Sequence, residues 1–307
     1  MTYQQLSRRL AKIYGEGEAK AMARMVFEVR YGLTMGEILL MGSEECRVKS
    51  EELEEIARRL ERQEPIQYVL GEAEFGGRRF HVAPGVLIPR PETAELCQWI
   101  IDNGQLIIDS PTPNTQRLRV GEQSSGMHPT PKILDIGTGS GCIAVTLAAE
   151  MPGAKVTAWD ISEAALAIAR ENAQRHHVDV QFEQIDILEK VESLKFKVES
   201  SEVNSEWSII VSNPPYVCEQ EKALMEKNVL DYEPHTALFV PDDDPLLFYR
   251  AIADYALQAL KPDGELYFEL NPLYAQETAA MLKEKGYHDI EIKKDMFDKL
   301  RFVKCKN

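Results

Sequence analysis

The chain has 307 residues, of which 44% are hydrophobic and 28% are charged, and its formal net charge is −15. This length fits two modest domains more easily than one, and the apolar content allows a sizeable core. No apolar run approaches the length of a membrane span, and the first ten residues lack the apolar core of a secretion signal. We therefore expect a protein of the cytoplasm without a membrane partner.

The negative charge is unevenly distributed. Residues 1–85 contain 13 Lys and Arg against 14 Asp and Glu, so most of the excess belongs to the remainder of the chain. A nucleic-acid backbone normally demands a basic surface. The acidic part therefore disfavours DNA or RNA as a direct substrate, although it leaves room for a local basic patch.

Cysteine and histidine show no pattern of metal ligands. The cysteines, at positions 46, 97, 142, 218 and 305, are odd in number, dispersed and without a C-x-x-C pair, and the six His residues lack ligand spacing. We expect reduced thiols and no metal.

Residues 1–72 are expected to form helices only, as a small separate domain. Three apolar stripes recur at helical spacing. Their members are Leu6, Leu10 and Ile13; Met22, Met25, Val26 and Val29; and Leu53, Ile56, Ala57 and Leu60. We predict that each stripe faces the core of this domain.

A hairpin is predicted at residues 75–82, because Gly76 and Gly77 lie between short runs of strand-forming residues. It belongs to a linker at 73–90, which precedes a second domain at 91–307 that opens with a helix near 93–101. Two polar segments, about 103–130 and 190–206, are interpreted as insertions without a chemical motif.

Residues 132–141 have the pattern of a short buried strand that runs into a glycine-rich turn, and an apolar helix follows at 142–149. Glycines let a backbone approach a ligand closely, and a helix start offers unpaired N–H groups. A nicotinamide-cofactor fingerprint would need G-x-G-x-x-G, but Cys142 occupies the position of its third glycine. With Asp135 before the glycines, the pattern is typical of S-adenosylmethionine sites.

Two acidic residues end the next predicted strands, at 155–160 and 180–186. Asp160 comes 25 residues after Asp135, at a position where a carboxylate can accept from both hydroxyls of a ribose. Asp186 is placed to accept from an adenine amino group. The alternative for either residue is an ordinary cap or turn.

The apolar run at 207–211 leads into Asn213-Pro214-Pro215-Tyr216. Pro215 biases Pro214 away from the helical region, and the two rings remove two backbone donors. The turn therefore offers the Asn213 side chain and the Pro214 carbonyl as acceptors, beside the aromatic face of Tyr216. Such a set can hold a planar amino group and present its nitrogen to an electrophile. The alternative is a strand-ending loop with an incidental proline pair.

The remaining pattern completes an α/β fold. We predict helices at 163–174, 245–260 and 273–285, a turn at 261–264, and strands at 265–270, 289–293 and 300–305. Alternating strands and helices with a final hairpin indicate a seven-stranded, mostly parallel sheet with a C-terminal antiparallel hairpin. Ligands bind such sheets beyond the carboxyl ends of the strands, where Gly137, Asp160, Asp186 and Asn213 all fall.

In this order, the motifs resemble class I methyltransferases, which have a Rossmann-like fold and modify exocyclic or amide nitrogens. More narrowly, the chain resembles the HemK/PrmC family of peptide chain release factor glutamine methyltransferases. The resemblance extends to Glu64–Gly71, Phe75-Gly76, Val86–Thr93, Asn228–His235, Ala237–Phe239, Asp295 and Arg301, and so covers nearly the whole chain. One departure is Ala94, where the family usually has Glu. If that carboxylate orders the cofactor site, we expect Glu95 to substitute.

The resemblance implies methyl transfer from S-adenosylmethionine to the amide N5 of the glutamine in a Gly-Gly-Gln loop of a release factor. It implies Asn213, Pro214 and Tyr216 as catalytic residues, with Pro215 also binding the substrate. The implied cofactor-binding residues are Asp135, Gly137, Thr138, Gly139, Ser140, Gly141, Asp160, Asp186, Ile187 and Asn213. The N-terminal helices would help to dock the release factor, and a monomer would suffice.

Other functions stay open. An adenine-N6 nucleic-acid methyltransferase would use the same turn to grip an extruded base and stack it on Tyr216, but the acidic charge and the linker signature argue against it. A ribosomal-protein glutamine methyltransferase would share the chemistry. A non-enzymatic cofactor-binding protein is disfavoured, because the Asn213–Tyr216 motif is intact.

Overall fold

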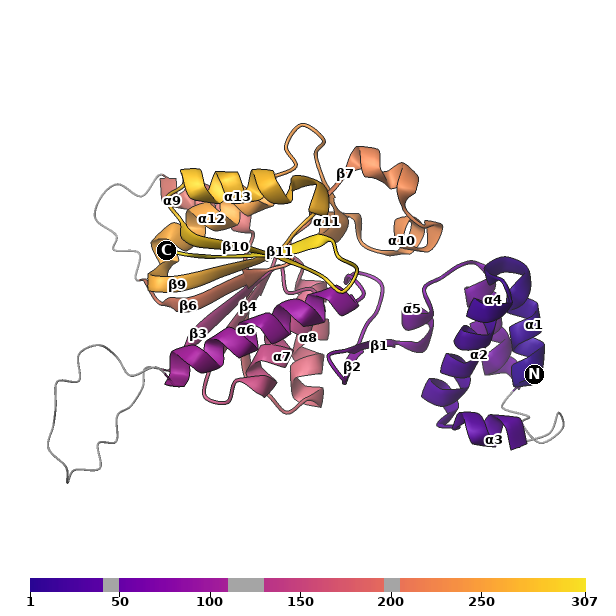
Figure 1. Cartoon of the computed structure of the whole chain (residues 1–307). Coiled ribbons are helices and arrows are strands. Elements are labelled where there is room, and N and C mark those ends of the chain that lie inside the picture. Colours follow the sequence, from indigo (N-terminus) through magenta and orange to yellow (C-terminus); the bar gives the residue numbers. More distant parts are fainter. Residues whose placement is uncertain (41–49, 110–129, 196–204) are drawn as a thin grey trace, which may run out of the picture. The chain divides into compact units, whose positions relative to one another are not determined.

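The computed structural model describes residues 1–40, 50–109, 130–195 and 205–307. Two compact units make up the chain (Figure 1). The first contains Met1–Ala73, Val82–Pro84 and Leu224–Glu233, and the second contains Glu74–His81, Gly85–Ala223 and Pro234–Asn307. Cys46 and most of the two predicted insertions lie outside the described residues.

The first unit is mainly helical. Its helices are α1 (Tyr3–Tyr14), α2 (Glu16–Tyr31), α3 (Met35–Leu40), α4 (Ser50–Glu61), α5 (Ile66–Leu70) and α10 (Lys227–Tyr232). Helices α1 to α5 share one apolar core, to which α10 contributes no buried residue. Members of all three predicted stripes are buried together, among them Leu6, Val26 and Leu60. Ile13 and Met25 are instead 40% exposed, because they lie at the edge of an apolar helix face rather than along its centre.

One helix of this unit comes from far along the chain. The segment Leu224–Glu233, which contains α10, clusters with the N-terminal helices, and the Tyr232 hydroxyl donates to the Arg62 carbonyl at 2.9 Å. Chain order alone places this segment with the second unit, directly after the Asn213–Tyr216 turn. Its membership of the helical unit is therefore a finding of the tertiary structure.

The second unit is built on a seven-stranded sheet in the order β10-β11-β9-β6-β3-β4-β5. The strands are β3 (Lys132–Ile136), β4 (Lys155–Asp160), β5 (Val180–Gln184), β6 (Trp207–Ser212), β9 (Leu260–Glu269), β10 (His288–Lys294) and β11 (Leu300–Lys306). β3, β4, β5, β6 and β9 run parallel, whereas β11 pairs antiparallel with both β9 and β10. The predicted mostly parallel sheet with a C-terminal antiparallel hairpin is confirmed.

Helices cover both faces of this sheet (Figure 1). One face carries α6 (Pro91–Asp109), α7 (Cys142–Glu150) and α8 (Glu163–Arg175), and the other carries α9 (Ile187–Lys195), α12 (Leu247–Ala259) and α13 (Ala275–Glu284). Successive strand residues point to opposite faces. In β3, Ile133 therefore packs in the first layer and Leu134 in the second, which explains why two successive residues of this strand are both apolar.

Short elements complete the described chain. They are β1 (Glu72–Phe75), β2 (Arg78–His81), β7 (Val217–Cys218), η1 (Glu219–Leu224), α11 (His235–Leu238), β8 (Phe239–Val240) and η2 (Pro272–Tyr274). The predicted hairpin forms from β1 and β2. Gly76 and Gly77 have φ values of 54° and 75°, which a tight two-residue turn requires.

Several boundaries differ from the sequence prediction. α6 continues to Asp109, past the expected start of the first insertion, and α9 occupies the expected start of the second. The turn predicted at 261–264 lies inside β9, where pairing with β6 jumps from Leu260 to Glu265. The chain does turn there, because Asp263 has a φ of 61°, but the turn interrupts the pairing within one strand instead of separating two elements.

Candidate active site

A cavity of about 540 Å³ lies at the carboxyl ends of β3, β4, β5 and β6, and its volume is typical of a small-molecule site. The predicted site residues that line it are Gly137, Gly139, Asp160, Asp186, Ile187, Asn213, Pro214 and Pro215. Tyr216 lines a second, smaller cavity. Asp135, Thr138, Ser140 and Gly141 line neither.

The glycine loop between β3 and α7 forms one wall of the large cavity. Gly137 and Gly139 have φ values of 76° and 55°, and a Cβ built on either would meet nothing within 4 Å. The backbone at these positions therefore borders open space that a ligand can approach closely. The N–H groups of Gly137 and Thr138 donate to the Trp159 carbonyl at 2.8 and 2.9 Å, which anchors the loop to β4.

Gly141 serves packing, and we expect Gly141→Ala to lower the free energy of unfolding by about 1–3 kcal/mol. An added Cβ would lie 2.9 Å from the Ala169 Cβ, at a φ of 80° that side chains rarely adopt. Gly153→Ala is the matched control, because Gly153 has a φ of 94° but nothing within 4 Å of an added Cβ. Denaturant titration compares the two variants. Equal losses of stability would contradict a role for the Ala169 contact.

Asp160 is the last residue of β4 and borders the large cavity. Its Oδ2 accepts from the Gly139 N–H at 2.8 Å, and its Oδ1 accepts from the Ser162 N–H at 2.9 Å. Burial raises the pKa of this carboxyl group, and the two hydrogen bonds oppose the shift. The carboxylate thus braces the glycine loop and still has lone pairs for a ligand.

Asp186 lies beyond β5, which ends at Gln184, rather than inside the strand as expected. Its Oδ1 accepts from the Leu188 N–H at 2.8 Å, and its carbonyl accepts from the Lys190 N–H at 2.9 Å. These bonds satisfy donors at the start of α9. Asp186 therefore caps a helix and, with Ile187, also forms part of the cavity wall.

Asp135 lies beneath the glycine loop and is completely buried. The Thr138 hydroxyl donates to its Oδ2 at 2.6 Å. Burial raises the pKa of Asp135 to about 7, and the hydrogen bond from Thr138 opposes the shift. Asp135 organises the loop from inside the fold, so the cavity contact expected from the sequence is absent at this residue.

The buried Asp135 carboxyl group predicts a pH-dependent stability. An aspartate titrates near pH 3.9 in an unfolded chain, whereas Asp135 titrates near pH 7 in the folded protein. Between these two pH values, the folded protein therefore keeps a proton on Asp135 that the unfolded chain has lost. The contribution of Asp135 to the free energy of unfolding falls as the pH rises from about 4 to about 7, by about 1.4 kcal/mol per pH unit.

Asp135→Asn should remove this contribution. As the pH rises from about 5 to about 8, the free energy of unfolding of the wild type should fall relative to that of the variant. Denaturant titrations at several pH values measure it. A difference that stays constant over this range would refute the raised pKa.

The Asn213–Tyr216 turn follows β6 and borders both cavities. Asn213 and Pro214 line both, and the preceding Ser212 hydroxyl donates to the Ile136 carbonyl at 2.6 Å, which ties the end of β6 to the end of β3. The asparagine amide is thus placed at the boundary between the larger and the smaller cavity.

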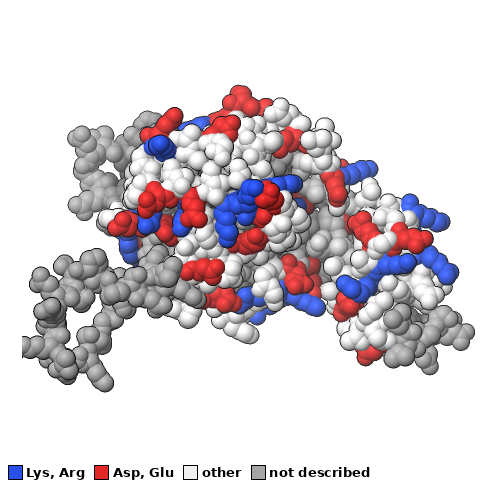
Figure 2. All heavy atoms as spheres, in the orientation of Figure 1, with Lys and Arg blue, Asp and Glu red and all other residues white. Residues whose placement is uncertain are grey.

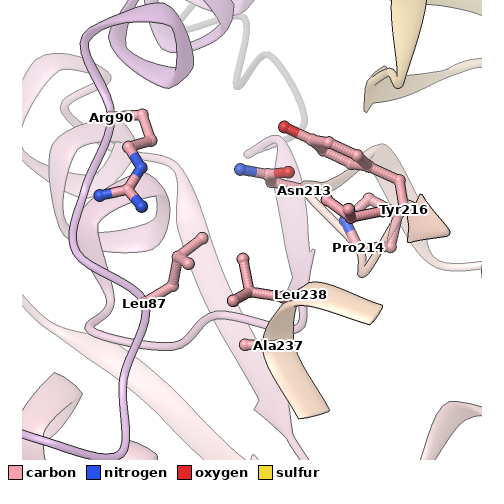
Figure 3. A pocket seen from close by; sticks show the side chains of 8 residues that line it. Leu87, Arg90, Asn213, Pro214, Tyr216, Ala237 and Leu238 are labelled. Atoms are coloured by element: carbon pink, nitrogen blue, oxygen red, sulfur yellow. The ribbon is translucent and has the colours of Figure 1, made fainter. Parts of the chain in front are cut away.

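The smaller cavity is a slot of about 50 Å³. Asn213 and Tyr216 lie on one side of it, and Leu87 and Arg90 lie across from them (Figure 3). Apart from the amide, the aromatic ring and the guanidinium group, the slot is lined by the apolar residues Leu87, Pro214, Val217, Ala237 and Leu238. Such a mixture suits a small planar group that has both apolar faces and a polar edge.

A buried carboxylate, Glu269 at the end of β9, connects this turn to α6. The Thr93 hydroxyl donates to its Oε2 at 2.6 Å, and the Tyr216 hydroxyl donates to its Oε1 at 3.1 Å. Thr93 Oγ1 also accepts from Asn213 Nδ2 at 3.3 Å. Burial raises the pKa of Glu269, and the Thr93 hydrogen bond and the charge of Arg301 oppose the shift.

Over the described ranges, His, Cys, Asp and Glu side chains do not gather in threes or more at a site that could hold a metal ion. None of the helices in this part of the chain combines the length and apolar character of a membrane span. Cys97, Cys142, Cys218 and Cys305 are buried free thiols.

Comparison with known proteins identifies the family. The PrmC N-terminal domain matches residues 2–71, and the methyltransferase small domain matches residues 123–231. A solved structure from Alicyclobacillus acidocaldarius, a release factor-specific protein-(glutamine-N5) methyltransferase, is 25% identical over 74% of this chain and 99% of that chain, with a TM-score of 0.39. The release factor glutamine methyltransferase of Bacteroides thetaiotaomicron is 45% identical, over 96% of this chain and 95% of that protein. That of Flavobacterium psychrophilum is 39% identical, over 98% and 96%. The chain belongs to the release factor glutamine methyltransferase family.

Glu95, next to the departure from the family pattern at Ala94, bonds to a loop outside both cavities. The Glu95 Oε1 atom accepts from the Met296 N–H at 3.1 Å, and Glu95 lines neither cavity. That Glu95 substitutes for the missing carboxylate stays a prediction. The carboxylate that bonds the adjacent Thr93 is Glu269.

Several residues of this family member's site escaped the sequence analysis, among them Leu87, Arg90 and Ala237 of the cavity walls. Glu269 ends the apolar run of β9, and an acid at a strand end is the signal that pointed to Asp160, so it was detectable. Phe248 and Ile252 of α12 form part of the large cavity wall. They carry no sequence signal, because only the packing of α12 decides which of its apolar residues face a ligand.

Proposed function

We propose that this protein is an enzyme that transfers a methyl group from S-adenosylmethionine to the side-chain amide nitrogen of the glutamine in a Gly-Gly-Gln loop of a peptide chain release factor. Membership of the release factor glutamine methyltransferase family supports this function. The observation that carries it is the position of Asn213 and Pro214, which line both cavities. One cavity is of cofactor size and the other is a narrow slot.

The large cavity fits S-adenosylmethionine. Gly137 and Gly139 leave its glycine wall open, Asp160 supplies a carboxylate acceptor, and Ile161 and Ile187 supply apolar surface. A nucleoside requires this mixture, because hydrogen-bond acceptors hold its ribose while apolar side chains enclose its base. When bound, the cofactor supplies a methyl group that its sulfonium makes electrophilic.

The residues of the turn hold the acceptor amide. A carboxamide nitrogen is a poor nucleophile, because its lone pair is delocalised into the carbonyl. Asn213 Oδ1 and the Pro214 carbonyl accept from the two N–H groups, which fixes the nitrogen with its lone-pair face toward the methyl donor. Tyr216 packs against the amide plane. Positioning and electrostatics then supply most of the rate enhancement.

Membership of the family favours a release factor as the partner, and the helical domain at 1–72 would help to dock it. The enzyme would act as a monomer in the cytoplasm. On the face shown in Figure 2, basic and acidic side chains of the described residues are interspersed. Together with the net charge of −15, this favours a protein substrate over a nucleic-acid backbone.

One experiment tests the function directly. Release factor is incubated with the enzyme and S-adenosylmethionine, and its Gly-Gly-Gln peptide is analysed by mass spectrometry. We expect one methyl group on the glutamine, and none when that glutamine is replaced by alanine. A parallel incubation uses an adenine-containing oligonucleotide and a ribosomal protein. Methylation of either one in preference to release factor would overturn the proposal.

A further inference from the structure

Glu269 is a buried ionisable side chain for which the chemistry above has no use. It is 2% exposed, and its two oxygens accept separately from Thr93 and Tyr216. Burying a carboxylate is unfavourable unless hydrogen bonds or charges compensate it. Here both donors belong to the immediate surroundings of the slot, since Tyr216 lines it and Thr93 contacts Asn213.

The hydrogen bonds of Thr93 have a fixed direction. A threonine hydroxyl has one proton to donate and two lone pairs that accept, and the Thr93 hydroxyl donates to Glu269 Oε2. At 2.6 Å, the Thr93–Glu269 distance is that of a hydroxyl donating to a carboxylate. The single proton is therefore committed to Glu269, and only a lone pair of Thr93 Oγ1 faces Asn213.

This direction decides how the Asn213 amide is turned. A lone pair on Thr93 attracts the NH2 end of the amide and disfavours the oxygen end, in agreement with the 3.3 Å contact from Asn213 Nδ2. With its nitrogen on Thr93, the amide directs its Oδ1 away from Thr93. An acceptor oxygen is what a substrate NH2 group needs.

We propose that Glu269 acts through Thr93 as a positioning device that holds Asn213 with its oxygen available to the substrate amide. The inference rests on the proposed function, because it concerns the acceptor that binds the glutamine NH2. Glu269 and Thr93 are positioning residues rather than catalytic ones. Without this device, the Asn213 amide can turn by half a rotation and present its own NH2, which repels the NH2 of the substrate.

The same carboxylate also secures the other end of the turn. The Tyr216 hydroxyl donates to Glu269, and the Tyr216 carbonyl accepts from Asn271 Nδ2 at 2.9 Å. Asn271 is itself buried, and its N–H donates to the Tyr249 hydroxyl at 3.1 Å. The turn is therefore held through both its first and its last residue, and Glu269 is the group common to both.

The test compares Thr93→Val, which keeps the shape of the side chain and removes the hydroxyl, with Thr93→Ser, which keeps the hydroxyl. We expect Thr93→Val to lower kcat for release factor methylation roughly 10- to 100-fold, and Glu269→Gln to lower it at least about 10-fold. Thr93→Ser should stay within about 3-fold of the wild type. The KM for release factor and the Kd for S-adenosylmethionine should change far less than kcat.

Two buried residues of the second unit provide matched controls. Thr278 donates to the Tyr274 carbonyl at 2.8 Å, and Glu265 accepts from the Tyr267 hydroxyl at 2.6 Å on the same strand as Glu269. Thr278→Val and Glu265→Gln make the same chemical changes away from the turn. A Thr93→Val enzyme with the kcat of the wild type would overturn the inference, as would equal losses in the control variants or no rescue by serine.

A failure of the proposed function is distinguishable from a failure of this inference. If the wild-type enzyme leaves release factor unmethylated, the function is wrong, and this is seen before any variant is compared. The amide orientation has its own readout in the NMR signals of the Asn213 side-chain NH2, assigned through their loss in Asn213→Asp. Thr93→Val should shift these signals and accelerate their hydrogen exchange, whereas Thr278→Val should not. Unchanged Asn213 signals in Thr93→Val would refute the positioning device.

Discussion

Asn213→Ala is expected to lower kcat for release factor methylation by about 1,000-fold. The substitution removes an acceptor at the boundary of the two cavities, and a carboxamide needs both of its N–H groups fixed before its nitrogen can face the methyl donor. Loss of one preorganised hydrogen-bonding group that stabilises a transition state has effects of this size. The affinity for S-adenosylmethionine should stay within a few-fold.

Quantitative mass spectrometry of the Gly-Gly-Gln peptide measures the turnover, and calorimetry measures cofactor binding. Asn103→Ala is the control, because the Asn103 amide donates to the Trp99 carbonyl on α6 at 3.0 Å and lines neither cavity. Near-normal methylation by Asn213→Ala would rule out Asn213 as an acceptor that holds the substrate amide. A parallel loss of cofactor affinity would instead show that Asn213 acts mainly in the cofactor site.

Asp160→Ala is expected to weaken the binding of S-adenosylmethionine by about 100-fold. Hydrogen bonds to a charged group contribute about 1.5–3 kcal/mol each, and about 1.4 kcal/mol corresponds to a tenfold change in Kd. The change also frees the Gly139 N–H, which now donates to Asp160 at 2.8 Å, so the glycine wall of the cavity loses a support.

Calorimetric titration of the wild type, Asp160→Ala and Asp160→Asn separates two contributions of Asp160, its charge toward the ligand and its support of the Gly139 N–H. Asparagine retains one acceptor oxygen for the Gly139 N–H but loses the charge, so its Kd should lie between the other two. Asp102→Ala is the control, because Asp102 accepts from Gln98 on the exposed side of α6 at 2.8 Å. An Asp160→Ala protein that binds the cofactor like the wild type would show that Asp160 does not hold the ribose.

Local motifs were sufficient to predict the sheet and the strand ends at which the large cavity lies. The glycine loop, Asp160 and the Asn213–Tyr216 turn each follow directly from an apolar strand, and the parallel strands bring these ends together. Asp135 shows the limit of this reasoning. Its place before the glycines indicated a ligand contact, but its side chain turns inward to Thr138, because residues of a strand alternate between two directions.

The sequence by itself determined the family, the α/β class and the polar groups at the strand ends, because each of these depends on neighbouring residues and their spacing. Only the tertiary structure brought Glu269 to Thr93 across 176 residues, Thr93 to Asn213 across 120, and α10 to the N-terminal helices. These contacts depend on the order of strands in the sheet and on which helix face packs inward. No short window of sequence encodes either, since both are set by the burial of apolar surface over the whole unit.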